Sequence, residues 1–195
     1  TIRDYNAEAQ FWCSTILGKT EAMSELEEDR GRLYGLLGWL MMTLGEHKKG
    51  RAASEQAITL AEKSNDFYTM SRAYATAGLA SCFLGDFPAA FPAIEKAESI
   101  AREHDLAAEL AFILGSRAQL EFIGKGDLPI ARVSVLEASD LVHKAGFIWA
   151  STFLDIGMGH IAAVMGDLET ARAAFGRSAN TARRLGNKRG AYSSE

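Results

Sequence analysis

The chain has 195 residues, a formal net charge of −4, 48% hydrophobic residues and 24% charged residues. This ordinary globular composition excludes disordered, collagen-like and strongly charged tail classes. Alanine occurs 32 times and valine four times. Because alanine favours helices and β-branched side chains favour strands, we predict an all-α protein.

Membrane and secretory features are not evident in the sequence. The longest charge-free runs, Leu33–Gly45 and Ala73–Gly85, have 13 residues each, fewer than the roughly 18 that indicate a spanning helix. No basic-then-apolar signal peptide opens the chain. Cys13 and Cys82 lie far apart in apolar stretches, and we interpret them as buried free thiols, with a single disulfide as the alternative. These features favour a cytoplasmic protein.

Residues 1–29 are interpreted as an irregular N-terminal helical segment. Asp4–Leu17 has a helical pattern, Gly18 is expected to turn the chain, and a short acidic helix is expected near Glu21–Glu28. The segment is either an irregular cap or the remnant of an earlier repeat.

From residue 30 onward the sequence repeats. Gly45, Gly85, Gly126 and Gly166 each follow an apolar run. They recur with a period of about 40 residues, which is typical of solenoid proteins. We predict four helix pairs at 30–66, 67–106, 107–147 and 148–187. Residues 188–195 are expected to begin a further helix or to form the C-terminal end. The first of these would be expected if the sequence is part of a longer repeat array.

Each predicted pair has a first helix, a turn at the glycine, and a second helix. The first helix is apolar almost all round, which marks an inner layer, whereas the second has one apolar face. The acidic residue after each turn glycine is expected to cap the second helix. Pro92 is expected to delay the start of its helix. The residues twenty positions after the turn glycine suit the left-handed conformation of a helix end: Asn65, Asp105, Gly146 and Gly186.

Small residues recur in the same phase, seven before and five and twelve after the turn glycine. Gln119 in the third unit departs from the first of these columns. The pattern resembles the tetratricopeptide repeat, although its units of about 40 residues are longer than the usual 34. It is similar to arrays in bacterial MalT-like and other LuxR-type signal-transduction regulators. The resemblance implies a right-handed α-solenoid of antiparallel helix pairs that binds protein or peptide and has no catalytic role.

In tetratricopeptide-like arrays the first helices line a concave groove, so the resemblance places partner-binding residues on them by phase. The lining is apolar with a basic pair at its N-terminal end, which suits an apolar peptide or amphipathic helix. The alternative is that these side chains belong to the core, most evenly balanced for Leu79 and Leu120. We call these nine residues the groove set: Arg32, Trp39, Met42, Arg72, Leu79, Phe83, Leu120, Phe153 and His160.

Motifs for catalysis or ligand chemistry are incomplete in this sequence. The four histidines share no metal-ligand spacing with a cysteine or carboxylate. No phosphate-binding loop, nucleophile elbow or kinase signature is complete. The basic C-terminal unit lies within a chain of net charge −4, so we expect no direct nucleic-acid binding. We therefore predict no enzyme activity, no cofactor, no metal site and no membrane association.

The function predicted from the sequence is a protein- or peptide-binding module in the sensor or scaffold region of a bacterial transcriptional regulator. Two alternatives remain open. One is a small-molecule or signal-peptide sensor that uses the groove, and the other is self-association into a homo-oligomer. If the groove hypothesis holds, Trp39→Ala and Phe83→Ala should remove partner binding and leave helicity nearly intact.

Overall fold

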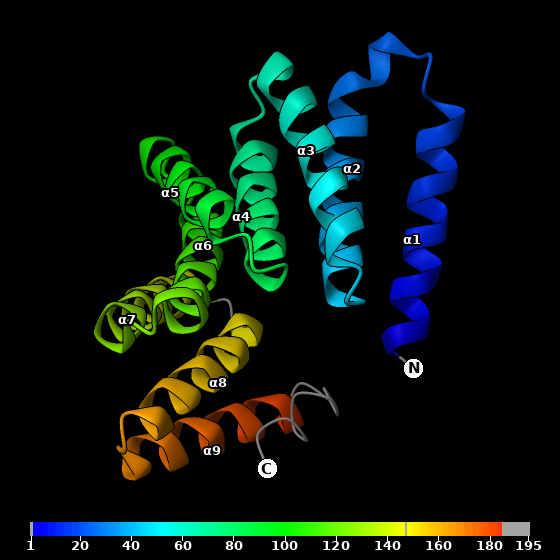
Figure 1. Cartoon of the computed structure of the whole chain (residues 1–195). Helices are drawn as coiled ribbons and strands as arrows, with labels where there is room; N and C mark the ends of the chain where they lie inside the picture. Colours follow the sequence, from blue (N-terminus) through cyan, green and yellow to red (C-terminus); the bar gives the residue numbers. More distant parts are fainter. Residues whose placement is uncertain (1, 147, 185–195) are drawn as a thin grey trace. The chain divides into compact units, whose positions relative to one another are not determined.

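A computed structural model describes residues 2–146 and 148–184 (Figure 1). Within these ranges the chain is helical and has no strand, which confirms the predicted all-α class. It divides into two compact units after Leu106, which are described in turn. The first unit contains α1 (Ile2–Lys19), a 3-10 turn (Ser24–Leu26), α2 (Glu27–Thr43), α3 (His47–Ser64), α4 (Phe67–Phe83) and α5 (Phe87–Glu103). The second contains α6 (Ala107–Leu120), a π-helical turn η2 (Glu121–Lys125), α7 (Leu128–Ala145), α8 (Ile148–Val164) and α9 (Leu168–Arg184).

Neighbouring helices pack as pairs in both units. In the first unit α2 packs on α3 and α4 on α5, while α3 also contacts α4 and the two first helices, α2 and α4, touch each other. The second unit repeats this scheme with the pairs α6–α7 and α8–α9, and again the two first helices are in contact. This pairwise packing is the tetratricopeptide-like arrangement that the repeat predicted.

The turns have the backbone geometry that the repeating glycines predicted. Gly45, Gly85, Gly126 and Gly166 have φ of 83°, 77°, 68° and 80°, a region that side-chain-bearing residues rarely adopt. The predicted left-handed helix ends are confirmed at Asn65 and Asp105, both with φ of 54°, and at Gly146 with φ of 73°. The fourth predicted position, Gly186, lies outside the described residues.

Aspartates cap the second helices as predicted, with one exception. Asp86, Asp127 and Asp167 each accept a hydrogen bond from the backbone N–H three residues on, in Ala89, Ile130 and Thr170. At the first turn the prediction was wrong, because Glu46 makes no such bond. Its carboxylate, one methylene further from the backbone than that of aspartate, pairs instead with Lys49 at 2.9 Å.

Two local expectations were wrong. Gly18 does not turn the chain, because α1 continues through it to Lys19, and the acidic stretch forms a 3-10 turn followed directly by α2. Pro92 does not delay α5, which begins at Phe87. A proline in a helix interior removes one backbone hydrogen bond. The helix tolerates this loss because the turns on either side remain helical and because buried Ile94, Ala97 and Ala101 pack it against the core.

The third unit contains one extra residue, which lies in the π-helical turn. The interval from Gly85 to Gly126 exceeds the intervals before and after it by one position. Glu121–Lys125 is a π turn, which accommodates one residue more than an α turn. Positions before this turn are therefore shifted by one relative to the other units. The small-residue column passes through buried Ala118, and Gln119, which seemed to break it, is the exposed residue that follows.

Because the extra residue is confined to the π turn, its removal should be tolerated. We expect deletion of Ile123, which is 45% exposed, to convert the turn to regular α-helix and to change the midpoint of thermal unfolding by only a few degrees. Deletion of buried Leu114 should instead unfold this unit, because it rotates half of α6 by roughly 100°. Circular dichroism melting of both variants checks this, and equal loss of helicity would contradict the assignment.

Candidate protein-binding surface

The structure divides the groove set by exposure. Four of its members lie at the surface, two are half-buried, and three are buried. The exposed members are Arg32, Phe83, Phe153 and His160; the half-buried members are Trp39 and Arg72; the buried members are Met42, Leu79 and Leu120. Six of the nine belong to the first unit up to Phe83 and three to the second, and each unit presents its members separately.

The three buried residues have identifiable reasons for their burial. Leu120 is fully buried because the π turn shifts the phase, which places it in the core column of Leu40 and Ile161. Met42 packs against Gly50 of α3, where an added Cβ would come within 3.2 Å of its side chain. Leu79 is 4% exposed and lies in the stretch of α4 that is buried almost throughout. In this structure the three side chains therefore lie in the core, which was the alternative to a place in the groove.

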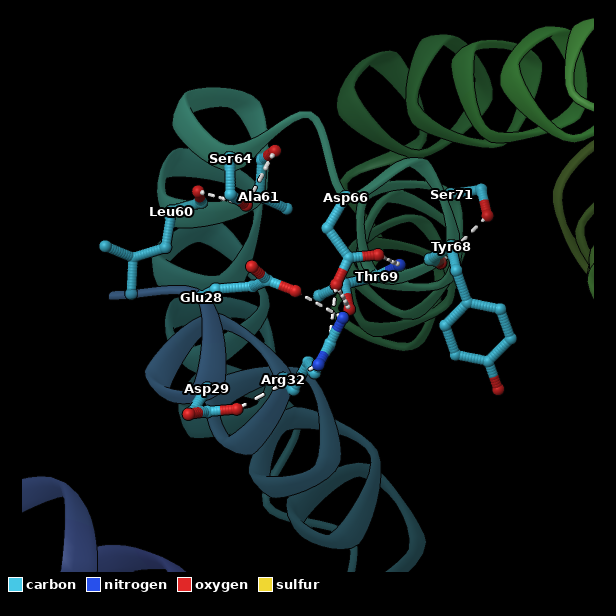
Figure 2. Close-up of polar contacts among 10 residues, drawn as sticks. All are labelled: Glu28, Asp29, Arg32, Leu60, Ala61, Ser64, Asp66, Tyr68, Thr69 and Ser71. Atoms are coloured by element: carbon cyan, nitrogen blue, oxygen red, sulfur yellow. Dashed lines mark hydrogen bonds and ion pairs between the residues drawn. The ribbon is translucent and has the colours of Figure 1, made fainter. Parts of the chain in front are cut away.

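Arg32 is engaged by the chain's own carboxylates (Figure 2). Its Nε donates to Asp66 Oδ2 at 2.9 Å, and its terminal nitrogens contact Glu28 and, at 3.9 Å, Asp29. Asp66 is also the N-cap of α4, where it accepts hydrogen bonds from the Thr69 backbone N–H at 3.1 Å and from its hydroxyl at 2.9 Å. Arg32 thus links α2 to the start of α4.

Hydrogen bonds and neighbouring charges favour the ionised form of both Arg32 and Asp66. The hydrogen bond that Arg32 donates to Asp66 is the main cause that raises the pKa of Arg32, and the charges of Asp66, Glu28 and Asp29 add to it. Burial by itself would raise the pKa of Asp66, but the hydrogen bonds of Thr69 and Arg32 outweigh it and lower that pKa. Both groups are therefore ionised at neutral pH, and the pairing leaves Arg32 a structural role.

An arginine of the second helix lies in the same phase in two of the units and acts on the capping aspartate of the next turn. Arg51 and Arg132 each lie six residues after a turn glycine. The guanidinium of Arg51 contacts the capping Asp86 at 2.8 Å. For Asp167, hydrogen bonds from Thr170 are the main cause of a lowered pKa, and the charge of Arg132 contributes. Arg51 thus holds Asp86 by direct contact, whereas Arg132 favours the ionised form of Asp167 through its charge.

Aromatic side chains are exposed on the first helices. Phe83 is 42% exposed and stacks on His47 with ring centroids 4.9 Å apart. Tyr68, which the groove set does not include, is half exposed, and the Arg72 guanidinium lies 5.9 Å from its ring centroid. Phe153 on α8 is 63% exposed. We call Tyr68, Phe83 and Phe153 the exposed aromatic residues. Tyr68 precedes Arg72 by four positions, and residues four apart lie on the same helix face. Tyr68 could therefore have been predicted from the sequence as a neighbour of Arg72.

The N-terminal helix presents another apolar face that the groove prediction missed. Tyr5, Trp12 and Ile16 of α1 are 72%, 54% and 42% exposed. The spacing of seven and four residues was visible in the sequence and is typical of one helix face. The other side of α1 packs in a cluster with α2 and α3 that includes Cys13, Leu17, Leu37 and Leu40.

Few groups suited to catalysis or metal binding come together. Cys13 and Cys82 are buried free thiols, as predicted, and burial raises the pKa of both. Among the residues that the structure describes, no three His, Cys, Asp or Glu side chains are grouped so that they could hold a metal ion. No helix in these ranges is long and apolar enough to cross a membrane.

Comparison with known proteins identifies the repeat. The sequence family described as tetratricopeptide repeat matches residues 31–64, which correspond to α2 and α3. This segment is a tetratricopeptide repeat. Curated protein sequences show no significant match. Among solved structures, the chain is similar to that titled "Crystal structure of BtubC (BKLC) from P. vanneervenii", with a TM-score of 0.68 and 14% identity over 100% of this chain and 88% of that one.

At this identity the structural similarity shows the fold alone. Together with the repeat at 31–64, it supports the tetratricopeptide-like interpretation of the other helix pairs, which share the turn glycines and, at the second to fourth turns, the capping aspartates. Tetratricopeptide repeats generally mediate protein–protein interaction or scaffolding, and they are typically non-catalytic. The groove residues themselves remain a prediction.

Proposed function

We propose that this tetratricopeptide-like chain is a protein-binding scaffold module whose partner contacts the first helices. The observation that supports the proposal most directly is the exposure of aromatic side chains on these helices: Phe153 at 63%, Tyr68 at 51% and Phe83 at 42%. Aromatic residues dominate the energetics of protein interfaces because each buries a large area with few rotatable bonds.

The exposed aromatic residues contribute less to the core than their buried neighbours do. Phe153 precedes Leu154 on α8, and Leu154 is only 8% exposed. The adjacent position thus supplies the packing, and Phe153 remains accessible. The partner we propose is an apolar or amphipathic peptide or helix, with no cofactor and no catalytic step. Trp39 and Arg72 complete the proposed contact residues of the first unit, and His160 those of the second. The buried members and the internally paired Arg32 are left out.

The proposal extends to the wider context of the chain. The repeat period of about 40 residues, longer than the usual tetratricopeptide unit, is similar to that of sensor arrays in bacterial transcriptional regulators, and we propose such a cytoplasmic regulator as the parent protein. In that setting the module would receive a protein signal, while other domains would act on it. The sequence of the complete gene tests this part, because flanking nucleotide-binding and DNA-binding domains are expected.

Substitution of Phe153 separates binding from folding. We expect Phe153→Ala to change the unfolding free energy by only about 0.5 kcal/mol, as for other exposed positions. We also expect it to weaken partner binding about tenfold or more. The measurements are urea unfolding followed by circular dichroism, and quantitative capture of partner from the native host by the wild-type chain and the variant.

Val133 on α7 supplies the matched control, since it is also 63% exposed but lies on a second helix. Val133→Ala should leave capture unchanged. Equal capture by the Phe153→Ala and Val133→Ala variants would contradict the proposal, and so would unfolding of the Phe153→Ala variant.

A further inference from the structure

The apolar face of α1 continues onto α2. Asn6 Nδ2 donates to Thr43 Oγ1 at 3.3 Å, and Arg30 Nη1 donates to the Glu21 carbonyl at 3.1 Å. The start of each helix is thus held near the end of the other, so the two run antiparallel, side by side (Figure 1). This register sets Leu36, which is 49% exposed, at the level of α1 between Trp12 and Ile16.

The exposed residues lie on the same side of the helix pair. Trp12 directly precedes Cys13, Ile16 precedes Leu17, and Leu36 precedes Leu37; the second residue of each couple belongs to the buried cluster between α1, α2 and α3. A step of one residue toward the N-terminus rotates the direction of the side chain by roughly 100° about the helix axis. In an antiparallel pair, this step on each helix rotates both side chains toward the same side of the pair. Tyr5, Trp12, Ile16 and Leu36 therefore form one apolar surface, the α1–α2 surface.

One end of this surface is acidic. Residues 20–29 contain five carboxylates and no cation: Glu21, Glu25, Glu27, Glu28 and Asp29. Arg32 contacts Glu28 and Asp29, and Lys63 lies 3.4 Å from Glu27. Glu21 and Glu25 are exposed and have no ion-pair partner within the part of the chain that the structure describes. Lys19 and Arg30 flank this stretch, so over residues 19–32 the five carboxylates outnumber the cations by two. An occupant that carries positive charge at this end would therefore meet net negative charge.

We infer that the α1–α2 surface binds an amphipathic helix from another protein, with lysine or arginine at the end that reaches residues 20–29. Two parallel ridges of apolar side chains on adjacent helices fit a third helix, which packs roughly 8–10 Å from its neighbours. The apolar stripe and the acidic end together specify the chemistry of this helix. The inference rests on the proposed function in that both assign a protein partner, but it names a different surface.

Two designed peptides test the inference on the full chain. Both are labelled helices of about 18 residues, roughly 27 Å long, with the same leucine stripe, and they carry either lysine or glutamate at the polar positions of one end. We expect the lysine peptide to bind about tenfold more tightly by fluorescence anisotropy at low salt. High salt should reduce this advantage by screening. Equal binding of the two peptides, or no binding of either, would overturn the inference.

Matched leucine variants locate the binding. Leu36→Gln and Trp12→Gln should each weaken the lysine peptide about tenfold, whereas Leu136→Gln, at a position 51% exposed on α7, should change it less than twofold. Circular dichroism checks that each variant folds. Unchanged binding by folded Leu36→Gln and Trp12→Gln variants would place the peptide elsewhere and overturn the inference.

Sedimentation velocity decides between a foreign helix and a second copy. We expect a monomer, and concentration-dependent association that Trp12→Gln abolishes would make a second copy the occupant and overturn the inference. Failure of this inference can be distinguished from failure of the proposed function. Partner capture that depends on Phe153 but not on Trp12 would support only the proposed function.

Discussion

Replacement of Gly159 with alanine is expected to lower the free energy of unfolding of the second unit by about 1–3 kcal/mol. Gly159 lies on α8 where the ring of Phe175 on α9 approaches closely, and an added Cβ would be 2.5 Å from one ring carbon. No pair of carbon atoms tolerates that distance, so the ring or the helices must shift. The loss should exceed the gain of about 1 kcal/mol that alanine brings to a helix interior.

Gly176 on α9 provides the control for this experiment. A Cβ at Gly176 would have no heavy atom within 4 Å, so Gly176→Ala should stabilise by up to about 1 kcal/mol through helix propensity alone. Urea unfolding of both variants measures the difference. If Gly159→Ala were as stable as Gly176→Ala, the close approach of α8 and α9 at this column would be wrong.

Asp66→Ala is expected to destabilise the first unit by about 1–2 kcal/mol, because it removes the cap of α4. It also removes a carboxylate from Arg32, although Arg32 is more than half exposed and this loss adds little. Asp66→Asn should cost less, since the amide oxygen still accepts from the Thr69 N–H. Thermal unfolding of the two variants separates the contribution of the helix cap from that of the carboxylate charge. An equal loss of stability in both variants would assign the effect to the charge.

The contribution of Asp66 should also depend on pH. Its pKa is lower in the folded chain than its ordinary value, so the folded state binds this proton less readily than the unfolded state. The carboxylate therefore stabilises fully above about pH 4, the ordinary range for aspartate. This stability is lost as the pH falls through the folded pKa. We expect the stability advantage of wild type over Asp66→Asn to be constant near pH 7 and to shrink below pH 4. An advantage that persists in acid would contradict the ion-pair description.

The regular part of the fold was predictable because it depends on local backbone chemistry. A left-handed turn needs glycine, asparagine or aspartate, and a helix start prefers a short acceptor side chain. The turns and most caps therefore appear where the period placed them, and Glu46 differs because its side chain is longer. The burial of Leu120 had a visible cause in the sequence, since the longer interval between Gly85 and Gly126 marks an inserted residue. Only the π turn at Glu121–Lys125 shows where the insertion lies.

The candidate surface was less predictable, because exposure is a property of neighbours. Leu79 and Phe83 are both apolar residues of α4, four positions apart, yet one is 4% and the other 42% exposed. Likewise, Arg32 resembled a binding cation in sequence, and the Asp66 carboxylate that pairs with it is 34 positions away.

The sequence by itself determined the helical class, the period and the turns, because each follows from the conformational preferences of residues close together in the chain. Only the tertiary structure decided which apolar side chains a partner can reach and that α1 and α2 share an exposed face. These depend on which helices approach each other, and such approaches join residues tens of positions apart through packing that no local pattern records.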